Sequence, residues 1–218
     1  MHIFDIYNKY NIMPSLQTHM LRVAGVASFI CENFNEKELI NTNNIIFACL
    51  LHDMGNIIKF DLSLFPHFVK SEGFDYWKNV QDEFINKYGT DEHIATYMIV
   101  KELGVSKQIL KLVQSIGFSN SKNNYYTDDF NCKICAYSDF RVTPYGVDTL
   151  ENRLKDGKIR FIKNKMKTYN PKLDKFDEFV IYIKKMENQI FKKTVISPDF
   201  ITVNKIKPLI SNLSKFGI

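Results

Sequence analysis

Side chains that commonly bind metals stand inside two strongly apolar segments of this chain. The doublet His52–Asp53 follows a run of seven apolar residues, Ile45 to Leu51, and Asp139 lies within the segment CKICAYSDFRV. A carboxylate without a partner is costly to bury. Each of these carboxylates therefore needs compensation, which a divalent cation, a helix cap or a salt bridge would provide.

His19 completes a possible ligand set. It lies in the segment LQTHMLRVAG, where Arg22 follows three residues later on the same helical face. Together with His52, Asp53 and Asp139 it would form a site of two histidines and two carboxylates from three helices. Mixed nitrogen and oxygen ligands suit Mn, Fe, Co, Ni or Zn. A lone histidine in a helix is usually an ordinary surface or core residue, so the prediction depends on all four residues.

The elements that would carry these residues show helical periodicity almost throughout. Helices are expected in LQTHMLRVAG, IIFACLLHDMGN, GTDEHIATYMIVKELG, SKQILKLVQSIG and CKICAYSDFRV, and a long polar loop is predicted over residues 117–131. Further helices are expected in TLENRLKDGKIRFIKNKM, with Gly157 as a possible break, along the apolar stripe from Phe176 to Ile190, and over 199–216, interrupted by Pro208. No run of strands is evident, so the sequence predicts an all-α fold.

Charge is distributed unevenly along the 218 residues, which are enough for one large domain or a domain with an extension. Residues 1–145 hold 13 basic and 16 acidic residues, whereas residues 146–218 hold 16 and 8. We therefore expect a metal-binding core over 1–145 and a basic helical extension over 146–218 that packs on this core. The basic surplus could attract nucleic acid or phosphorylated ligands, but its alternation with apolar residues is more typical of a solvated helical face.

Composition also restricts the expected location of the protein. No run approaches the roughly 18 apolar residues of a membrane span, and the first residues lack the pattern of a secretory signal. The four cysteines lie in apolar helical patterns, which favours core packing over a zinc or redox role for the segment CKIC. A reduced, cytoplasmic protein without a membrane partner is expected.

In order and spacing, His19, the doublet His52–Asp53 and Asp139 resemble the H…HD…D signature of the HD-domain superfamily of metal-dependent phosphohydrolases. The resemblance covers residues 15–145, and SDFRVTPYGVDTLENRL also looks like the corresponding stretch of some uncharacterised bacterial HD-domain proteins. It implies an HD-domain helical core in which these four residues bind Mn, Fe, Co, Ni, Zn or Mg. It further implies hydrolysis of a phosphoester of a nucleotide or a similar small phosphorylated molecule, because a bound divalent cation activates water and polarises a phosphoryl oxygen.

Several nearby residues are candidates for binding the substrate. His52, Asn56 and Lys59 are spaced at i, i+4 and i+7, so they share one helical face and Asn56 and Lys59 can point towards the metal site. Arg22, Lys59 and Arg141 are candidate phosphate contacts, since arginine is well suited to bidentate phosphate binding.

His93 is a candidate general acid or phosphate donor, although a histidine at a helix N-terminus can also simply face solvent. With Asp53 and Lys59 it completes the expected catalytic residues. His67, in the segment LFPHF, is expected in a loop without a functional role. HD proteins with two metal ions supply two extra histidines between the HD doublet and the last aspartate. His93 fits the first, but the second is expected near positions 116–117, where this chain has isoleucine and glycine. A single ion is therefore favoured over two.

Asn56 distinguishes this chain from better-known subfamilies. Some HD nucleotidases have an acidic residue there, cyclic-dinucleotide phosphodiesterases have a lysine, and HDMGNIIK lacks the acidic pair of guanosine-tetraphosphate hydrolases. An amide cannot act as an acid or a base, which leaves open a non-catalytic metal- and nucleotide-binding sensor. A third alternative is a nucleic-acid-processing protein that uses the basic part 146–218, for which no recognised module is present. A homodimer is the default assembly.

Overall fold

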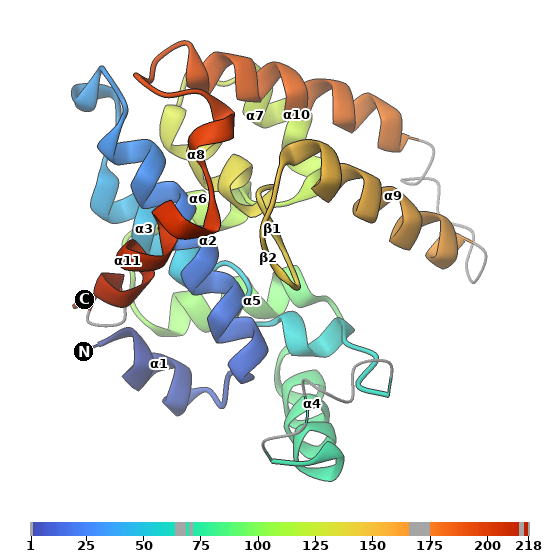
Figure 1. The fold of residues 1–218 in the computed structure, drawn as a ribbon. Helices are drawn as coiled ribbons and strands as arrows, with labels where there is room; N and C mark the ends of the chain where they lie inside the picture. The colour runs from blue at the N-terminus through green and yellow to red at the C-terminus, as the bar shows by residue number, and fades with distance from the viewer. Residues whose placement is uncertain (1, 64–68, 70–71, 166–174, 214–215, 218) are drawn as a thin grey trace.

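Helix α2 (Pro14–Glu32) runs through the centre of the computed structural model (Figure 1). It packs against α3 (Thr42–Leu51), α8 (Phe130–Asp139) and α11 (Val203–Leu213). The structure describes residues 2–63, 69, 72–165, 175–213 and 216–217. Within these residues the chain is almost entirely helical, which confirms the all-α prediction. None of the described helices is both long and apolar enough to cross a membrane.

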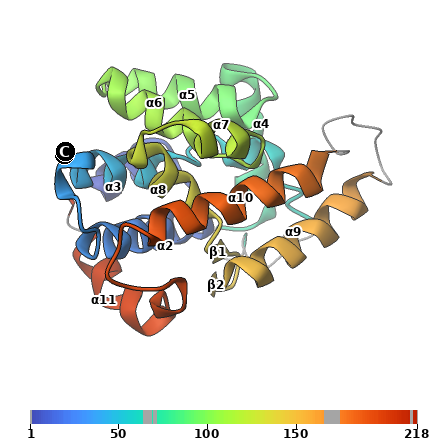
Figure 2. The same ribbon diagram turned by 90° about the horizontal axis from the view of Figure 1, so that it is seen from above.

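The other elements surround this central group (Figures 1 and 2). They are α1 (Ile3–Lys9), η1 (Lys37–Leu39), η2 (Asn56–Lys59), α4 (Phe74–Tyr88), α5 (Glu92–Glu102), α6 (Lys107–Ser115), η3 (Phe118–Asn120), α7 (Ser121–Tyr126), α9 (Leu150–Lys165), α10 (Phe176–Phe191) and η5 (Pro198–Phe200). The two-residue strands β1 (Val142–Thr143) and β2 (Gly146–Val147) form an antiparallel hairpin.

Helix α3 is buried on nearly all sides, which explains its uninterrupted apolar run. It packs against α2, α6 and α8, and every residue from Ile45 to Leu51 is buried. The helix begins after Asn41, whose side chain accepts a hydrogen bond from the backbone N–H of Asn44 at 3.0 Å.

Helices from residues 146–218 contact the rest of the chain along several elements. Helix α10 packs against α7 and α8, and α11 packs against α2. Helices α9 and α10 are joined by ion pairs between Lys158 and Asp177 at 3.0 Å and between Lys184 and Glu151 at 3.5 Å. The division of the chain at residue 145 into a core and an extension remains a prediction.

The loop predicted over residues 117–131 was wrong, because η3 and α7 occupy most of this segment. Tertiary contacts hold this short polar helix. The Asn124 amide donates to the carbonyl oxygen of Ser115 at 2.8 Å, and the Ser121 hydroxyl donates to that of Phe118 at 2.5 Å. Helix α7 also packs against α10, which follows it by some 50 residues. The helix propensity of residues 121–126 therefore did not predict α7.

Two other differences lie near the candidate site. The helix predicted over CKICAYSDFRV ends at Asp139, and the chain then turns into the β1–β2 hairpin. Helix α9 continues through Gly157, and α11 continues through Pro208, so neither residue breaks its helix.

Gly55 allows the turn after His52–Asp53 to lie directly on the first turn of α5. A Cβ atom on Gly55 would lie 2.6 Å from the backbone nitrogen of Thr96 and 2.7 Å from the carbonyl oxygen of Glu92. The backbone N–H of Gly55 donates to the Thr96 hydroxyl at 2.9 Å. This close approach fixes α5 against the end of α3.

We expect Gly55→Ala to lower the free energy of unfolding by roughly 1–3 kcal/mol, since the added methyl group meets backbone atoms that cannot move independently. Gly217→Ala is the matched control, because an added Cβ there meets no described atom within 4 Å. Denaturant unfolding of both variants tests this expectation. Equal stability of Gly55→Ala and the wild type would contradict the packing described for this turn.

Asp129 begins helix α8, whose last residue is Asp139. Its Oδ1 accepts the backbone N–H of Asn131 at 3.0 Å, and its Oδ2 accepts from Lys111 Nζ of α6 at 2.7 Å. Burial raises the pKa of the Asp129 carboxyl, but the hydrogen bonds from Lys111 and Asn131 outweigh it and lower the pKa to about 2. The charged carboxylate thus helps to fix the helix that carries Asp139.

Because the pKa of Asp129 in the folded state is below its ordinary value of 3.8, its charge stabilises the fold above about pH 4, and this contribution is lost as the pH falls through about 2. Asp129→Asn keeps an oxygen for the helix cap and removes the charge. We expect this variant to be less stable than the wild type near neutral pH, with a difference that shrinks between about pH 4 and 2. Denaturant unfolding across this pH range measures the difference, with Asp128→Asn, at an exposed neighbouring position, as control. A stability difference between Asp129→Asn and the wild type that did not depend on pH would refute the role given to the Asp129 charge.

Candidate metal centre

His52 ends α3 with its imidazole ring turned into the molecule. Its Nδ1 lies 2.8 Å from the carbonyl oxygen of Cys49 and donates to it, which orients the ring so that Nε2 faces the other three residues. This Nε2 atom is buried, and no group among the described residues forms a hydrogen bond with it. A buried polar atom without a partner is unfavourable, and a metal ion at this nitrogen would satisfy it.

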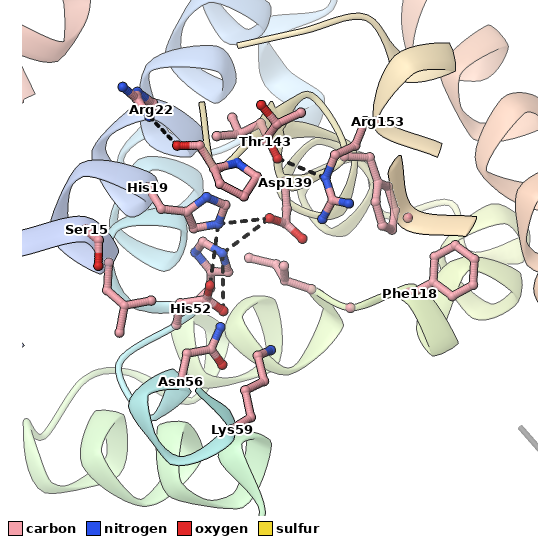
Figure 3. A pocket seen from close by; sticks show the side chains of 18 of the residues that line it. Ser15, His19, Arg22, His52, Asn56, Lys59, Phe118, Asp139, Thr143 and Arg153 are labelled. Atoms are coloured by element: carbon pink, nitrogen blue, oxygen red, sulfur yellow. Dashed lines mark hydrogen bonds and ion pairs between the residues drawn. The ribbon is translucent and has the colours of Figure 1, made fainter. Parts of the chain in front are cut away.

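Three more side chains converge on His52 Nε2 (Figure 3). His19 Nε2 of α2 lies 3.4 Å from Asp53 Oδ2 and 3.1 Å from Asp139 Oδ1. His52 Nε2 lies 3.5 Å from Asp53 Oδ1 and 3.6 Å from Asp139 Oδ1. Both imidazole nitrogens therefore face the same two carboxylates, and one donor atom each from His19, His52 and Asp53 lies within 4.8 Å of the others.

This donor set fits a divalent metal ion. Two imidazole nitrogens and two carboxylates are ligands that first-row transition metals accept. The separations of 3.1–3.6 Å between imidazole nitrogens and carboxylate oxygens are compatible with ligands bonded about 2.1 Å from one shared ion. The four residues of the sequence-derived ligand set are thus brought together, and their role as ligands remains a prediction.

Charge stabilises this cluster in the absence of a metal. Burial raises the pKa of the Asp139 carboxyl, but the hydrogen bond with His19 at 3.1 Å and the nearby imidazole of His52 outweigh burial and hold the pKa well below its usual range. Burial lowers the pKa of His52, but the charge of Asp53 and the interaction with Asp139 raise it to about 10. The two carboxylates therefore stabilise positive charge at this point.

The cluster lines a pocket of about 750 Å³, which is in the size range of small-molecule sites (Figure 3). One part of the lining is apolar and includes Phe118 and Phe176, whose ring centroids lie 4.8 Å apart. Four basic side chains also line the pocket, namely Arg22, Lys59, Arg153 and Arg160. A pocket with these walls is suited to a ligand that is part anionic and part apolar.

Four of the predicted substrate-binding residues line this pocket: Arg22, Asn56, Lys59 and His93. Asn56 is buried next to the cluster. Lys59 Nζ lies 3.5 Å from Glu92 Oε1, and the imidazole of His93 is 67% exposed, so both side chains keep access to solvent. His67 lies outside the described residues.

Arg141 corrects the sequence interpretation, because the structure does not bring it to this pocket. Its guanidinium is buried and donates to the carbonyl oxygens of Asp148, Pro198 and Ile201 and to the hydroxyl of Tyr137. The bonds to Pro198 and Ile201 connect the end of α8 to the segment before α11. Arg141 is therefore a structural residue and is no longer a candidate phosphate contact.

Sequence reasoning missed the two arginines that α9 contributes to the pocket. Arg153 Nε donates to the carbonyl oxygen of Val142 at 2.9 Å, and Arg160 Nη2 lies 2.7 Å from Asp156 Oδ2. With Gly157, these arginines stand at i, i+4 and i+7, so they share one face of α9. This spacing, in the basic part of the chain, is the signal that could have identified them.

The helical core and the four-residue cluster are the features of a helical domain with a candidate metal site. Residues 16–116 match the family model described as HD domain, and this segment supports membership of the HD-domain superfamily. Domains of this superfamily bind divalent metals and are generally hydrolases. Neither a curated protein nor a solved structure matches the chain. Asp139 and α9 lie beyond the matched segment.

We expect the wild-type protein to bind a single divalent ion, and Asp139→Asn and Asp53→Ala to weaken binding by roughly 100-fold or more, because each removes a charged ligand. Asp82→Asn, at an exposed position on α4, is the control. Metal analysis after dialysis and calorimetric titration give the occupancy and the affinity. A wild-type protein that retains no metal under any loading condition would show that the cluster is not a metal centre.

Proposed function

We propose that this protein is a metal-dependent phosphohydrolase that acts on a nucleotide or a similar small phosphoester. The observation that carries the proposal is the position of the two-histidine, two-carboxylate cluster in the lining of a pocket that also contains four basic side chains and an aromatic pair. Cations would bind the phosphate, and an aromatic surface would contact the base or another apolar group.

His19, His52, Asp53 and Asp139 would hold the metal ion. When bound, the ion activates water and polarises a phosphoryl oxygen. Mn, Fe, Co, Ni, Zn and Mg are the candidates, and we propose one ion. Asp53 follows a rigid buried helix, and the Cys49 carbonyl fixes the ring of His52, so these two ligands are oriented before substrate binds.

Arg153 is the strongest candidate for stabilising charge on the phosphoryl group. Its bond to the Val142 carbonyl uses Nε and orients the guanidinium, whose other N–H groups can then reach a ligand. Burial lowers the pKa of Arg153, whereas the carboxylates of Asp139 and Asp53 act in the opposite direction, and an arginine remains charged. A charge fixed beside the cluster would stabilise the negative charge that develops on phosphoryl oxygens.

Lys59 and His93 lie on a more accessible part of the lining. Glu92 approaches both, at 3.5 Å from Lys59 Nζ and 3.8 Å from His93 Nε2. Lys59 would add a phosphate contact, and His93 would donate a proton to the leaving-group oxygen. Asn56 would offer amide hydrogen bonds to substrate or water and cannot take part in proton transfer.

A metal- and nucleotide-binding sensor is the second candidate. The specific observation that favours it is Asn56, a neutral amide buried beside the cluster. The nucleic-acid alternative has less support, because basic residues such as Lys158 and Lys184 are engaged in ion pairs. The cytoplasmic location and the homodimer remain predictions.

A screen of metal-loaded protein against nucleotides and other phosphoesters tests the proposal. We expect turnover by the wild type and a loss of roughly 100-fold or more in kcat/KM in Arg153→Gln, with unchanged metal content, because one charge-stabilising group is removed. Lys158→Gln, which removes an equal charge from α9 at a residue paired with Asp177, should keep full activity. Nucleotide binding without turnover would favour the sensor, and absence of both binding and turnover would refute both candidates.

A further inference from the structure

Gly157 occupies the middle of α9 and lines the pocket, although the protein's own packing does not require a glycine there. The nearest described atoms to an added Cβ would be Arg153 Nη1 at 3.7 Å and Phe176 Cζ at 3.9 Å, which are ordinary van der Waals distances. Gly55, by contrast, is required by backbone atoms at 2.6 and 2.7 Å. Since glycine destabilises a helix interior relative to alanine, the bare backbone at Gly157 calls for another explanation.

Two arginines flank this bare stretch of backbone on the same helical face. Arg153 precedes Gly157 by four residues and Arg160 follows it by three, and all three residues line the pocket. Along the helix axis the two arginines are separated by about 10 Å. This part of the pocket therefore has the bare backbone of Gly157 as the floor of a groove, with a guanidinium group at each end.

Asp156 lies between the two guanidinium groups. Its Oδ2 is 2.7 Å from Arg160 Nη2 and 4.0 Å from Arg153 Nη1. Two positive charges therefore share one negative charge, and the group keeps a net positive charge while the carboxylate holds the Arg160 guanidinium in place. The Arg160 side chain is 47% exposed, so its remaining N–H groups can reach a ligand.

The Arg153 end of this face adjoins the candidate metal centre, because Arg153 and Asp139 line the same pocket and lie side by side in it (Figure 3). The Arg160 end lies about two helical turns further along α9. A phosphoryl group at the metal centre would therefore use Arg153, and Arg160 would be left for a second anionic group of the same molecule. Phe176, whose Cζ lies 3.9 Å from the added Cβ position, provides an apolar contact beside the groove.

Building on the proposed function, we propose that Gly157 and Arg160 form a second phosphate subsite, and that the substrate is a small nucleotide with two separate phosphate groups. One phosphate lies at the metal centre beside Arg153. The other lies over the bare backbone of Gly157 and is bound by Arg160. A molecule with a single phosphate fills only the first position.

Binding of two probes to the full-length, metal-loaded protein tests the subsite: adenosine 5′-monophosphate and adenosine 3′,5′-bisphosphate. Calorimetric titration gives both dissociation constants, and chromatography of the recovered probe corrects for turnover. We expect the wild type to bind the bisphosphate about tenfold tighter or more, the effect of one charge-assisted contact. Arg160→Gln should reduce this ratio to about one, whereas Lys155→Gln, on the same helix but outside the pocket lining, should preserve it.

Gly157→Ala provides an independent variant that should fold at least as well as the wild type. We expect its melting temperature to rise by roughly 2–4 °C, because alanine favours the helix, while bisphosphate affinity falls several-fold and monophosphate affinity is unchanged. Equal affinity of the wild type for the two probes, or no bisphosphate binding, would overturn the subsite. An unchanged ratio of the two dissociation constants in Arg160→Gln would also overturn the subsite.

The outcomes for the subsite and for the enzyme can be distinguished. Hydrolysis of monophosphates together with equal binding of the two probes would overturn the subsite and leave the phosphohydrolase in place. Bisphosphate binding that depends on Arg160, without turnover of any phosphoester, would support the subsite and overturn the catalytic proposal.

Discussion

The structure depends on one constraint, which is the partial burial of two carboxylates opposite two imidazole nitrogens at distances of 3.1–3.6 Å. Neither carboxylate could be placed there alone at low cost. Since the four residues come from α2, the end of α3 and the end of α8, these three helices must meet at one point. The packing of α3 between its neighbours, the turn that Gly55 permits and the cap that Asp129 provides for α8 all serve this meeting point.

The pocket is assembled from two parts of the chain with opposite charge. The segment before residue 145 supplies the carboxylates, and α9 supplies Arg153 and Arg160. Arg153 has two effects in this arrangement, because its charge offsets the carboxylates and also favours an anionic ligand next to them. The matched HD segment, residues 16–116, contains neither Asp139 nor α9. The later part of the chain is therefore needed to complete both the candidate ligand set and the pocket.

Sequence patterns predicted what local rules determine and missed what depends on distant contacts. The apolar run of α3 and the apolar stripe of α10 indicated their helices, and the order of the four ligand types indicated the cluster. Helix α7 was missed because contacts with α10 and with Ser115 hold a polar sequence in a helix. The prediction of which arginines line the pocket failed for a similar reason. Arg141 is two residues from Asp139 but turns towards other backbone carbonyls, whereas Arg153 reaches the pocket from the next helix.

His93 and Gly117 bear on the number of metal ions. An added Cβ on Gly117 would lie 3.9 Å from Cε1 of His93, so the position where a second additional histidine would be expected is indeed next to His93 and is occupied by glycine. His93, with an exposed imidazole, is then available to substrate. In sites with two metal ions, the second ion neutralises part of the phosphate charge. In a site with one ion this charge must be balanced by side chains, and the arginines of α9 stand where they could do so. The predicted single ion and the basic helix would thus be two aspects of one electrostatic arrangement.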